Sequence, residues 1–126
     1  MLGSNDVCAC LAVKDMDAAA KFYEETLGLE KSMSSPGGTF YKSGKGGVFV
    51  YPSSFAGTNQ ATAAAWQVDD VAGAVAELKG KGVTFEHYPD MPDVTMEGDV
   101  HVMGDMKAAW FKDPDGNILN IVNQVG

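Results

Sequence analysis

The sequence predicts an α+β fold made of two similar halves, in which each half is a strand, a helix and then a hairpin. Two internal repeats predict this architecture. The segment that starts at Val13 matches the segment that starts at Val68, and the segment from Phe40 matches the segment from Trp110. Repetition of this kind indicates one supersecondary unit that occurs twice. Because the second repeat spacing is longer than the first, the second half must hold an insertion, between residues 83 and 107.

Length and composition indicate one ordinary domain over residues 1–126, with module 1 at about 1–55 and module 2 at about 56–126. A hydrophobic content of 45% with 21% charged residues is normal for a globular protein. The net charge of −8 repels phosphate backbones and anionic lipids, so we expect no nucleic-acid and no membrane partner. The N-terminus lacks a basic segment followed by a long apolar stretch, and we expect a cytoplasmic protein.

Capping residues predict where the two helices begin and end. Asp15 and Asp70 follow predicted strands directly, and their carboxylates can accept hydrogen bonds from the amides of a first helical turn. Gly28 and Gly82 suit the left-handed residue that ends a helix. The sequence therefore predicts helices over about residues 16–27 and 71–79.

Alternation along the first strand predicts two different faces. Val7, Leu11 and Val13 should meet the helix, whereas Cys8, Cys10 and Ala12 should lie on the other face. An ordinary disulfide between the two cysteines would distort the strand, so we expect free, buried thiols.

The second half follows the same pattern. Ala64, Trp66 and Val68 should face the helix, leaving Ala63, Ala65 and Gln67 on the opposite face. If DPDGN (residues 113–117) is a five-residue hairpin loop, Trp110 pairs with Asn120, and both point away from the helix. No predicted helix covers this face in either half, so it is where we expect a ligand.

Two motifs around this duplication suggest a family. The stretch VKDMDAAAKFYEETLGL from Val13 and the stretch FKDPDGNIL from Phe111 resemble the vicinal oxygen chelate superfamily, over nearly the whole chain. That superfamily includes glyoxalases, extradiol dioxygenases, fosfomycin-resistance enzymes and bleomycin-resistance proteins. The resemblance implies two tandem βαβββ modules whose curved mixed sheets form a cup, and it implies a homodimer.

Enzymes of this superfamily hold a divalent metal on four equivalent strand positions, which the resemblance places at Cys8, Val50, Ala63 and Asn120. Alanine and valine carry no donor atom, and one thiolate with one amide falls short of the three ligands of a catalytic zinc. We therefore expect no metal at these positions and no cofactor.

The same residues allow other chemical roles. Cys8 and Cys10 could chelate a soft metal, but two sulfurs are half of a usual site and the chain has no further cysteine. His87 and His101 lie in the insertion, where a solvated or capping role is the simpler interpretation. A Cys8 thiolate paired with His101 is a further option, which the acidity of the chain disfavours. The insertion itself is either a lid or a solvated surface excursion.

The sequence thus favours a metal-free protein of the glyoxalase and bleomycin-resistance type that binds or sequesters a planar or cationic small molecule. Flat aromatic side chains would stack on the ligand and the amides would form hydrogen bonds to it. The alternative is a glyoxalase-like lyase or a dioxygenase-like enzyme with a displaced or non-standard metal site. The predicted ligand-binding residues are Cys8, Cys10, Phe40, Val50, Ala63, Gln67, His101, Trp110 and Asn120.

Overall fold

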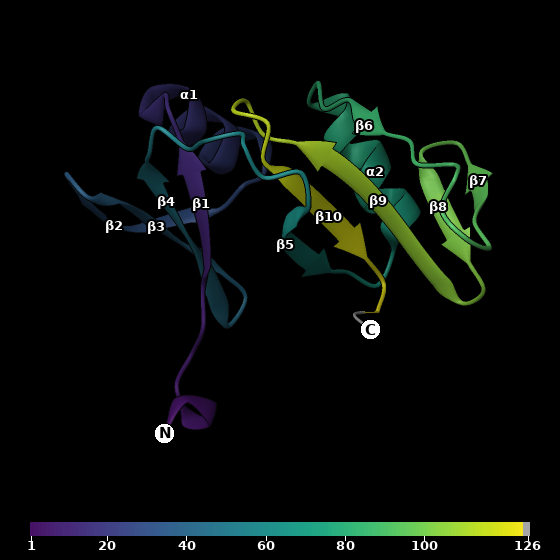
Figure 1. The fold of residues 1–126 in the computed structure, drawn as a ribbon, viewed down its shortest axis with the longest axis horizontal. Coiled ribbons are helices and arrows are strands. Elements are labelled where there is room, and N and C mark those ends of the chain that lie inside the picture. Colours follow the sequence, from purple (N-terminus) through teal and green to yellow (C-terminus); the bar gives the residue numbers. More distant parts are fainter. Residues whose placement is uncertain (125–126) are drawn as a thin grey trace. The chain divides into compact units, whose positions relative to one another are not determined.

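A computed structural model describes residues 1–124 of the chain, which forms two compact units (Figure 1). The first unit comprises Met1–Ala63 and the loop Asp113–Asn117, and the second comprises Ala64–Lys112 and the residues from Ile118 onward. The helical segments of the first unit are η1 (Leu2–Ser4), α1 (Met16–Ala20) and η2 (Lys21–Thr26), and its strands are β1 (Ala9–Val13), β2 (Glu30–Ser35), β3 (Gly38–Ser43) and β4 (Gly46–Pro52).

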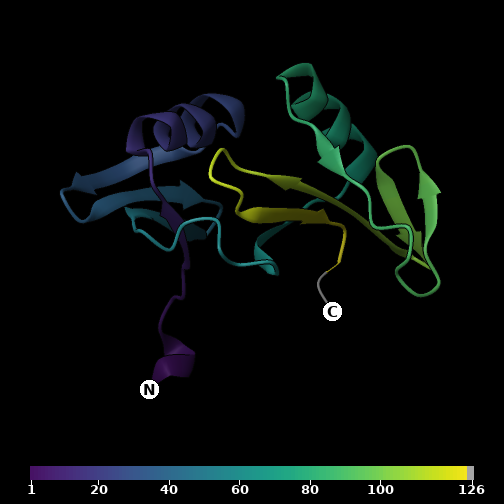
Figure 2. The same ribbon diagram turned by 45° about the horizontal axis from the view of Figure 1, so that its top comes forward.

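The first unit is a four-stranded open sheet with the order β1-β4-β3-β2. Strand β1 runs parallel to β4, and the other neighbours are antiparallel. The helix formed by α1 and η2 lies along one face of this sheet, as Figure 2 shows. The element order β1, α1, β2, β3, β4 is the predicted βαβββ module, with η2 continuing the helix.

The core of the first unit lies between the helix and the covered face of the sheet. In the middle of the two central strands, alternate residues are buried, Thr39 and Tyr41 in β3 and Val48 and Val50 in β4, because successive strand residues point to opposite faces. The ring of Tyr23 stacks on that of Tyr41, with centroids 6.1 Å apart. The buried residues of this face include Leu11, Val13, Tyr41, Val48 and Val50.

The loop Asp113–Asn117 is held in the first unit by a buried carboxylate. Asp113 Oδ2 accepts hydrogen bonds from Tyr23 Oη at 2.7 Å and from Asn117 Nδ2 at 2.8 Å. Asp113 Oδ1 accepts from the backbone N–H groups of Asp115 and Asn117. Asn117 Nδ2 also donates to the carbonyl of Ala12 in β1. The loop is therefore tied both to the helix and to the first strand.

The second unit repeats the plan with additions. Its elements are β5 (Thr62–Gln67), α2 (Val71–Gly80), β6 (Phe85–Glu86), β7 (Thr95–Glu97), β8 (Val100–Met103), β9 (Met106–Lys112) and β10 (Ile118–Val122). The sheet is open, has the order β5-β10-β9-β8-β7, and carries β6 on β9. Helix α2 lies along one face, and Phe111 and Leu119 are buried on the strands it packs against.

The insertion splits one strand of the second module into two. In the first unit, β2 pairs with β3. In the second unit, β6 and β8 both pair with β9, at Trp110–Phe111 and at Met106–Ala108 respectively. Strand β6 keeps the shorter repeat spacing from β2, and β8 keeps the longer one. The residues between them form an excursion whose strand β7 pairs with β8.

The predicted caps and hairpin are confirmed. Asp15 Oδ1 accepts from the amides of Asp17 and Ala18, and Asp70 Oδ1 accepts from that of Gly73. Gly28 and Gly82 have φ of 73° and 93°, which glycine adopts without strain. The hairpin pairs Trp110 with Asn120 and Phe111 with Leu119, as predicted.

The helix and the first strand depart from expectation in detail. The first helix changes from α to π geometry at Lys21 and ends at Thr26. Strand β1 starts only at Ala9, so Val7 lies outside it and is 87% exposed instead of meeting the helix. Within residues 1–124, no helix has the length and apolarity to span a membrane.

Candidate functional site

The face of the first sheet that the helix does not cover carries a row of aromatic rings. Phe40 in β3 pairs directly with Phe49 in β4, so their side chains share one face. Phe49 stacks on Tyr51 with ring centroids 5.9 Å apart and an interplanar angle of 12°. Phe40, Phe49 and Tyr51 are all half-buried. We call this surface the open face of the first unit.

The strand register assigns one predicted site position to a neighbouring residue. The repeat that matches Phe40 to Trp110 placed Val50 at the position equivalent to Asn120, opposite the aromatic residue of the preceding strand. In the structure, Phe40 pairs with Phe49, and Val50 is 1% exposed on the helix-covered face. The reason is loop length, because four residues separate the pair Lys42 and Gly47, whereas five separate Lys112 and Ile118. The open-face position is therefore Phe49.

A groove of about 540 Å³ lies at the edge of the open face. Two predicted site residues, Cys8 and Phe40, line it together with the tight turn between β3 and β4. The Phe40 ring occupies the space that a Cβ at Gly47 would need, so glycine at 47 lets the ring lie against the strand. The complete lining is Asp6, Val7, Cys8, Phe40, Lys42, Gly44, Lys45, Gly46 and Gly47.

The charges of the groove differ in sign from those of the whole chain. Lys42 and Lys45 line it with one carboxylate, that of Asp6, whereas the chain as a whole carries −8. Both lysines are exposed, Lys42 near the end of β3 and Lys45 in the turn that connects β3 to β4. A positively charged rim beside an apolar ring suits a ligand with a flat apolar part and a negative group.

The two thiols are free, as predicted, but they are exposed and not buried. Cys10 belongs to β1 and pairs with Phe49 of β4 on the open face. Cys8 comes just before β1 and lines the groove. Partial burial and a hydrogen bond with the Cys8 thiol raise the pKa of Cys10 above its ordinary value. Both thiols are accessible to solvent.

In the second unit, Asn120 is held by its own hairpin. Its Nδ2 donates to the carbonyl of Ala109 at 3.1 Å and, more weakly, to that of Ile121 at 3.4 Å. The residue is 7% exposed. Its Oδ1 accepts no hydrogen bond from any residue that the structure describes, so one acceptor stays available.

Three rings cover the face of the second sheet near Trp110. The His101 ring lies 4.8 Å from that of Trp110 at 87°, and the Tyr88 ring lies 5.6 Å from Trp110 at 77°. His101 is fully buried, contrary to the solvated or capping role expected of it. Tyr88 belongs to the inserted excursion, so the insertion folds back onto the face that corresponds to the open face of the first unit.

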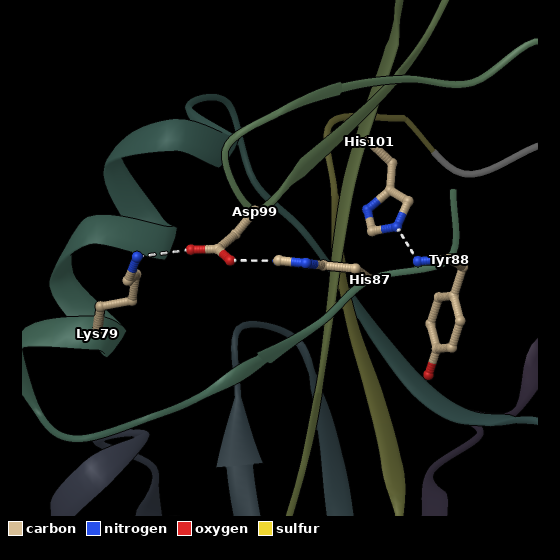
Figure 3. Close-up of polar contacts among 5 residues, drawn as sticks. All are labelled: Lys79, His87, Tyr88, Asp99 and His101. Atoms are coloured by element: carbon tan, nitrogen blue, oxygen red, sulfur yellow. Dashed lines mark hydrogen bonds and ion pairs between the residues drawn. The ribbon is translucent and has the colours of Figure 1, made fainter. Parts of the chain in front are cut away.

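The imidazole of His101 is fixed as a neutral acceptor (Figure 3). Its Nε2 accepts a hydrogen bond from the backbone N–H of Tyr88 at 2.9 Å, which places the ring proton on Nδ1. Burial lowers the pKa of His101, and backbone groups of Ala108 and Asp99 partly oppose this. Nδ1 itself makes no hydrogen bond of good geometry with the described residues.

Asp99, Lys79 and His87 form a polar cluster where the inserted excursion begins and ends (Figure 3). Asp99 bonds to Lys79 of α2 at 2.7 Å and to His87 at 2.6 Å. The hydrogen bond from Lys79, followed by that from His87, holds the pKa of Asp99 below its usual value. His87 follows β6 and Asp99 precedes β8, so the contact joins the two ends of the excursion.

The other predicted residues lie at the expected strand positions. Ala63 is half-buried and Gln67 is exposed at the two ends of β5. Ala64 and Trp66 in β5 and Val68 just after it are half-buried, as Ala63 is, so burial does not distinguish the two predicted faces of this strand.

The donor set does not fit the divalent metal of the superfamily's enzymes. At the four equivalent positions the side chains are Cys8, Phe49, Ala63 and Asn120, of which two lack any donor atom. Among residues 1–124, no group of three or more His, Cys, Asp or Glu side chains is arranged to hold a metal ion. A metal step cannot be derived from these residues.

Comparison with known proteins gives one family. A sequence model described as the Glyoxalase/Bleomycin resistance protein/Dioxygenase superfamily matches residues 6–121. A search of curated protein sequences returned no match.

Solved structures agree on the fold. A bleomycin resistance determinant encoded on the transposon Tn5 has a TM-score of 0.71 at 20% identity, covering 96% of this chain and 98% of its own. A lactoylglutathione lyase from Agrobacterium tumefaciens has a TM-score of 0.69 at 20% identity, covering 94% and 92%. A glyoxalase/bleomycin resistance protein from Streptomyces sp. CB03234 has a TM-score of 0.62 at 21% identity, covering 93% and 98%. The chain belongs to the Glyoxalase/Bleomycin resistance protein/Dioxygenase superfamily.

Proposed function

We propose that the protein binds a small planar molecule in the groove of the first unit, without a divalent metal cofactor. The observation that carries this proposal is the groove itself, about 540 Å³ in volume, with the Phe40 ring beside the basic turn. Pockets that hold drug-sized ligands have volumes of about 300–1,000 Å³ and combine apolar walls with a few polar groups. Binding or sequestration, and not turnover, is then the activity.

The charges of the groove refine the class of ligand. The overall charge of −8 suggested a cationic compound. Lys42 and Lys45, opposed only by Asp6 in the lining, favour instead a planar compound that carries a carboxylate, sulfonate or phosphate. Phe40 would stack on the planar part, and Cys8 would contribute soft apolar contact.

The predicted site residues of the second unit offer a ligand less surface than the groove does. Trp110 packs against His101 and Tyr88 of its own unit. These contacts leave less of its ring available to stack on a ligand. Asn120 keeps Oδ1 as an acceptor for a ligand or a water.

A thermal-shift screen tests the proposal. Planar aromatic compounds are offered in matched pairs, one with an anionic and one with a cationic substituent. At a ligand concentration of about 100 times Kd, linkage gives roughly 2.7 kcal/mol of stabilisation, which raises the melting temperature by several degrees. We expect anionic compounds to stabilise the wild type and Phe55→Leu equally, and Phe40→Leu much less. Phe55 is the matched control because it is 75% exposed and does not line the groove.

A double lysine variant tests the expected preference for anionic ligands. Lys42→Gln with Lys45→Gln should remove the advantage of the anionic member of each pair and leave the neutral stacking contribution. If no compound stabilises the wild type, or if Phe40→Leu responds as the wild type does, the groove is not the binding site. A uniform preference for cationic compounds would restore the ligand class that the overall charge suggests.

The competing function is an enzyme with a displaced metal site. Metal analysis of protein purified without chelator decides it. Near-stoichiometric zinc, nickel, manganese or iron that is lost in Asn120→Ala would overturn the metal-free proposal.

We also propose that the protein is a homodimer in the cytoplasm, and the side chain of Met33, which is 70% exposed, would suit a contact between two copies. Light scattering on the purified chain should give twice the mass of 13.3 kDa, and a monomer at micromolar concentration would contradict the dimer.

A further inference from the structure

The inserted excursion of the second unit is attached at two places that differ in chemistry (Figure 3). At its base, His87 and Asp99 are twelve positions apart in the sequence and bond to each other at 2.6 Å, and Lys79 bonds to the same carboxylate at 2.7 Å. Just beyond the base, the backbone N–H of Tyr88 donates to Nε2 of His101 at 2.9 Å. The first attachment joins charged groups near solvent, whereas the second depends on one fully buried imidazole.

The second attachment holds Tyr88 against Trp110. The Tyr88 ring lies 5.6 Å from the Trp110 ring and 5.9 Å from the His101 ring. Asn120 pairs with Trp110 in the last hairpin, so its side chain shares the same face of the sheet. Movement of Tyr88 away from the sheet would therefore expose more of the face that carries Trp110 and Asn120.

The closed position leaves one polar atom of His101 without a partner. Because Nε2 is the acceptor, Nδ1 carries the ring proton, and it is buried without a hydrogen bond of good geometry to the described residues. A buried donor with no acceptor costs free energy, and contact with water removes that cost. The single bond at Nε2 thus holds the excursion closed against an unfavourable contribution from Nδ1.

Protonation of His101 removes the acceptor that holds Tyr88. Both ring nitrogens of an imidazolium are donors, so Nε2–H would face the backbone N–H of Tyr88. Burial lowers the pKa of His101 and the positive charge of His87 lowers it further, while backbone groups of Ala108 and Asp99 offset part of this. Because the buried ring binds a proton less readily than a solvated ring does, acid favours the position in which the ring reaches water.

The strands on both sides of His101 bring no charge to its face. Met96 of β7 and Ala108 of β9 lie directly opposite it in the sheet. The charged residues next to them, Glu97 and Lys107, point to the other face because strand side chains alternate.

The remaining charged groups of this region are paired with one another. Glu86 of β6 lies on the same face as Trp110 and bonds to Lys112 at 3.2 Å. The carboxylate of Asp99 is shared by Lys79 and His87. In the described part of the chain, no carboxylate bonds to either ring nitrogen of His101, so none would hold an added proton there in the closed position.

We propose that the excursion between His87 and Asp99 is a hinged cover over Trp110, which the bond from Tyr88 to His101 latches at neutral pH and which protonation of His101 releases. Acid does not release the base, because an imidazolium at His87 donates to the Asp99 carboxylate more strongly than a neutral ring does. The base therefore acts as the hinge. Release makes Trp110 available as a stacking surface in addition to the groove of the first unit.

Fluorescence quenching tests whether acid uncovers Trp110. Trp66→Phe leaves Trp110 as the only tryptophan, and the bimolecular quenching constant for acrylamide, obtained from fluorescence lifetimes, reports its exposure. We expect this constant to rise between about pH 7.5 and pH 5.5, and to stay unchanged when His101→Gln is added, because the amide accepts a hydrogen bond but does not titrate. Adding Tyr88→Ala instead removes the covering ring, so Trp110 should be highly exposed at both pH values.

Hydrogen exchange separates release of the cover from unfolding of the whole unit. The protection factor of the Tyr88 amide, which corrects for the effect of pH on the chemical rate, should fall about tenfold between the same two pH values, because the released ring has the ordinary pKa of 6.5. The amide of Ala74, which donates to the carbonyl of Asp70 at the start of α2, should keep its protection. In His101→Gln both amides should keep their protection.

The proposal is wrong if acid leaves the exposure of Trp110 unchanged, if His101→Gln responds to acid as the parent protein does, or if Ala74 loses protection together with Tyr88. Tyr88→Ala keeps His101 and the sheet, so it decides the role of the cover even where His101→Gln does not fold. Exposure of Trp110 in Tyr88→Ala no greater than in the parent at pH 7.5 would show that Tyr88 is not the cover. None of these measurements involves the groove, so the ligand screen succeeds or fails separately.

Discussion

At the scale of single residues, the buried carboxylate of Asp113 is the polar group on which the first unit most depends. It is 4% exposed and accepts four hydrogen bonds, from Tyr23, Asn117 and the backbone of its own loop. A buried charge is tolerated only when its oxygens are paired in this way. Burial and the nearby Asp113 carboxylate raise the pKa of Tyr23, which therefore remains a donor.

Tyr23→Phe should destabilise the protein by about 1.5–3 kcal/mol, because a hydrogen bond to a buried charged group is lost. Tyr41→Phe is the matched control. Its hydroxyl donates at 2.9 Å to Glu24, which is half-buried, so we expect a loss of about 1 kcal/mol or less. Urea unfolding monitored by tryptophan fluorescence measures both. Equal losses in the two variants would show that the carboxylate of Asp113 is not specially dependent on Tyr23.

Local sequence signals predicted the helix caps and the pairing of the last hairpin correctly. The caps at Asp15 and Asp70 and the pairing of Trp110 with Asn120 could be predicted because each depends on residues a few positions apart. The burial of His101 could not, because it depends on Tyr88 folding back from the insertion onto β8 and β9. Val50 was assigned to the wrong face because a single-residue difference in loop length reverses every side chain that follows.

At the scale of elements, the inserted excursion is the main difference between the two modules. Its ends are joined by Asp99, which bonds to both His87 and Lys79, and its first residues place Tyr88 against Trp110. The insertion could be located from the change in repeat spacing. Its fold could not, because the stretch has neither helical nor strand periodicity to indicate that β7 would pair with β8.

The buried imidazole makes this element sensitive to pH. The pKa of His101 is lowered in the folded state, so below the ordinary value of 6.5 the unfolded chain binds a proton that the folded chain does not. Stability from this residue is therefore complete above pH 6.5 and is lost as the pH falls below it. Protonation would also remove the acceptor that Nε2 offers to the backbone of Tyr88.

Urea unfolding at about pH 7.5 and pH 5.5 checks this on the wild type and on His101→Gln, whose amide oxygen can still accept but does not titrate. We expect the wild type to lose more stability on acidification than the variant does. Asp99 and His87, which bond to each other, are present in both proteins. An identical loss in the two proteins would exclude His101 as the source.

At the scale of the whole molecule, the two modules share one plan but differ in what covers the corresponding face of the sheet. The first leaves its aromatic face open beside a basic groove, whereas the second covers the matching residue, Trp110, with its own insertion. The duplication and the superfamily could be predicted from the sequence. The groove could not, because its lysines and glycines lie in or next to a turn that local patterns mark only as a hairpin.

Amide chemical-shift mapping tests whether ligands bind in the groove of the first unit. A stabilising planar compound is added to isotope-labelled protein. The largest shifts should occur at the amides of Gly44, Gly46 and Gly47 and at Cys8, with little change at the indole N–H of Trp110. Shifts centred on Trp110 and Asn120, with the glycine amides unmoved, would exclude the groove and place binding on the second unit.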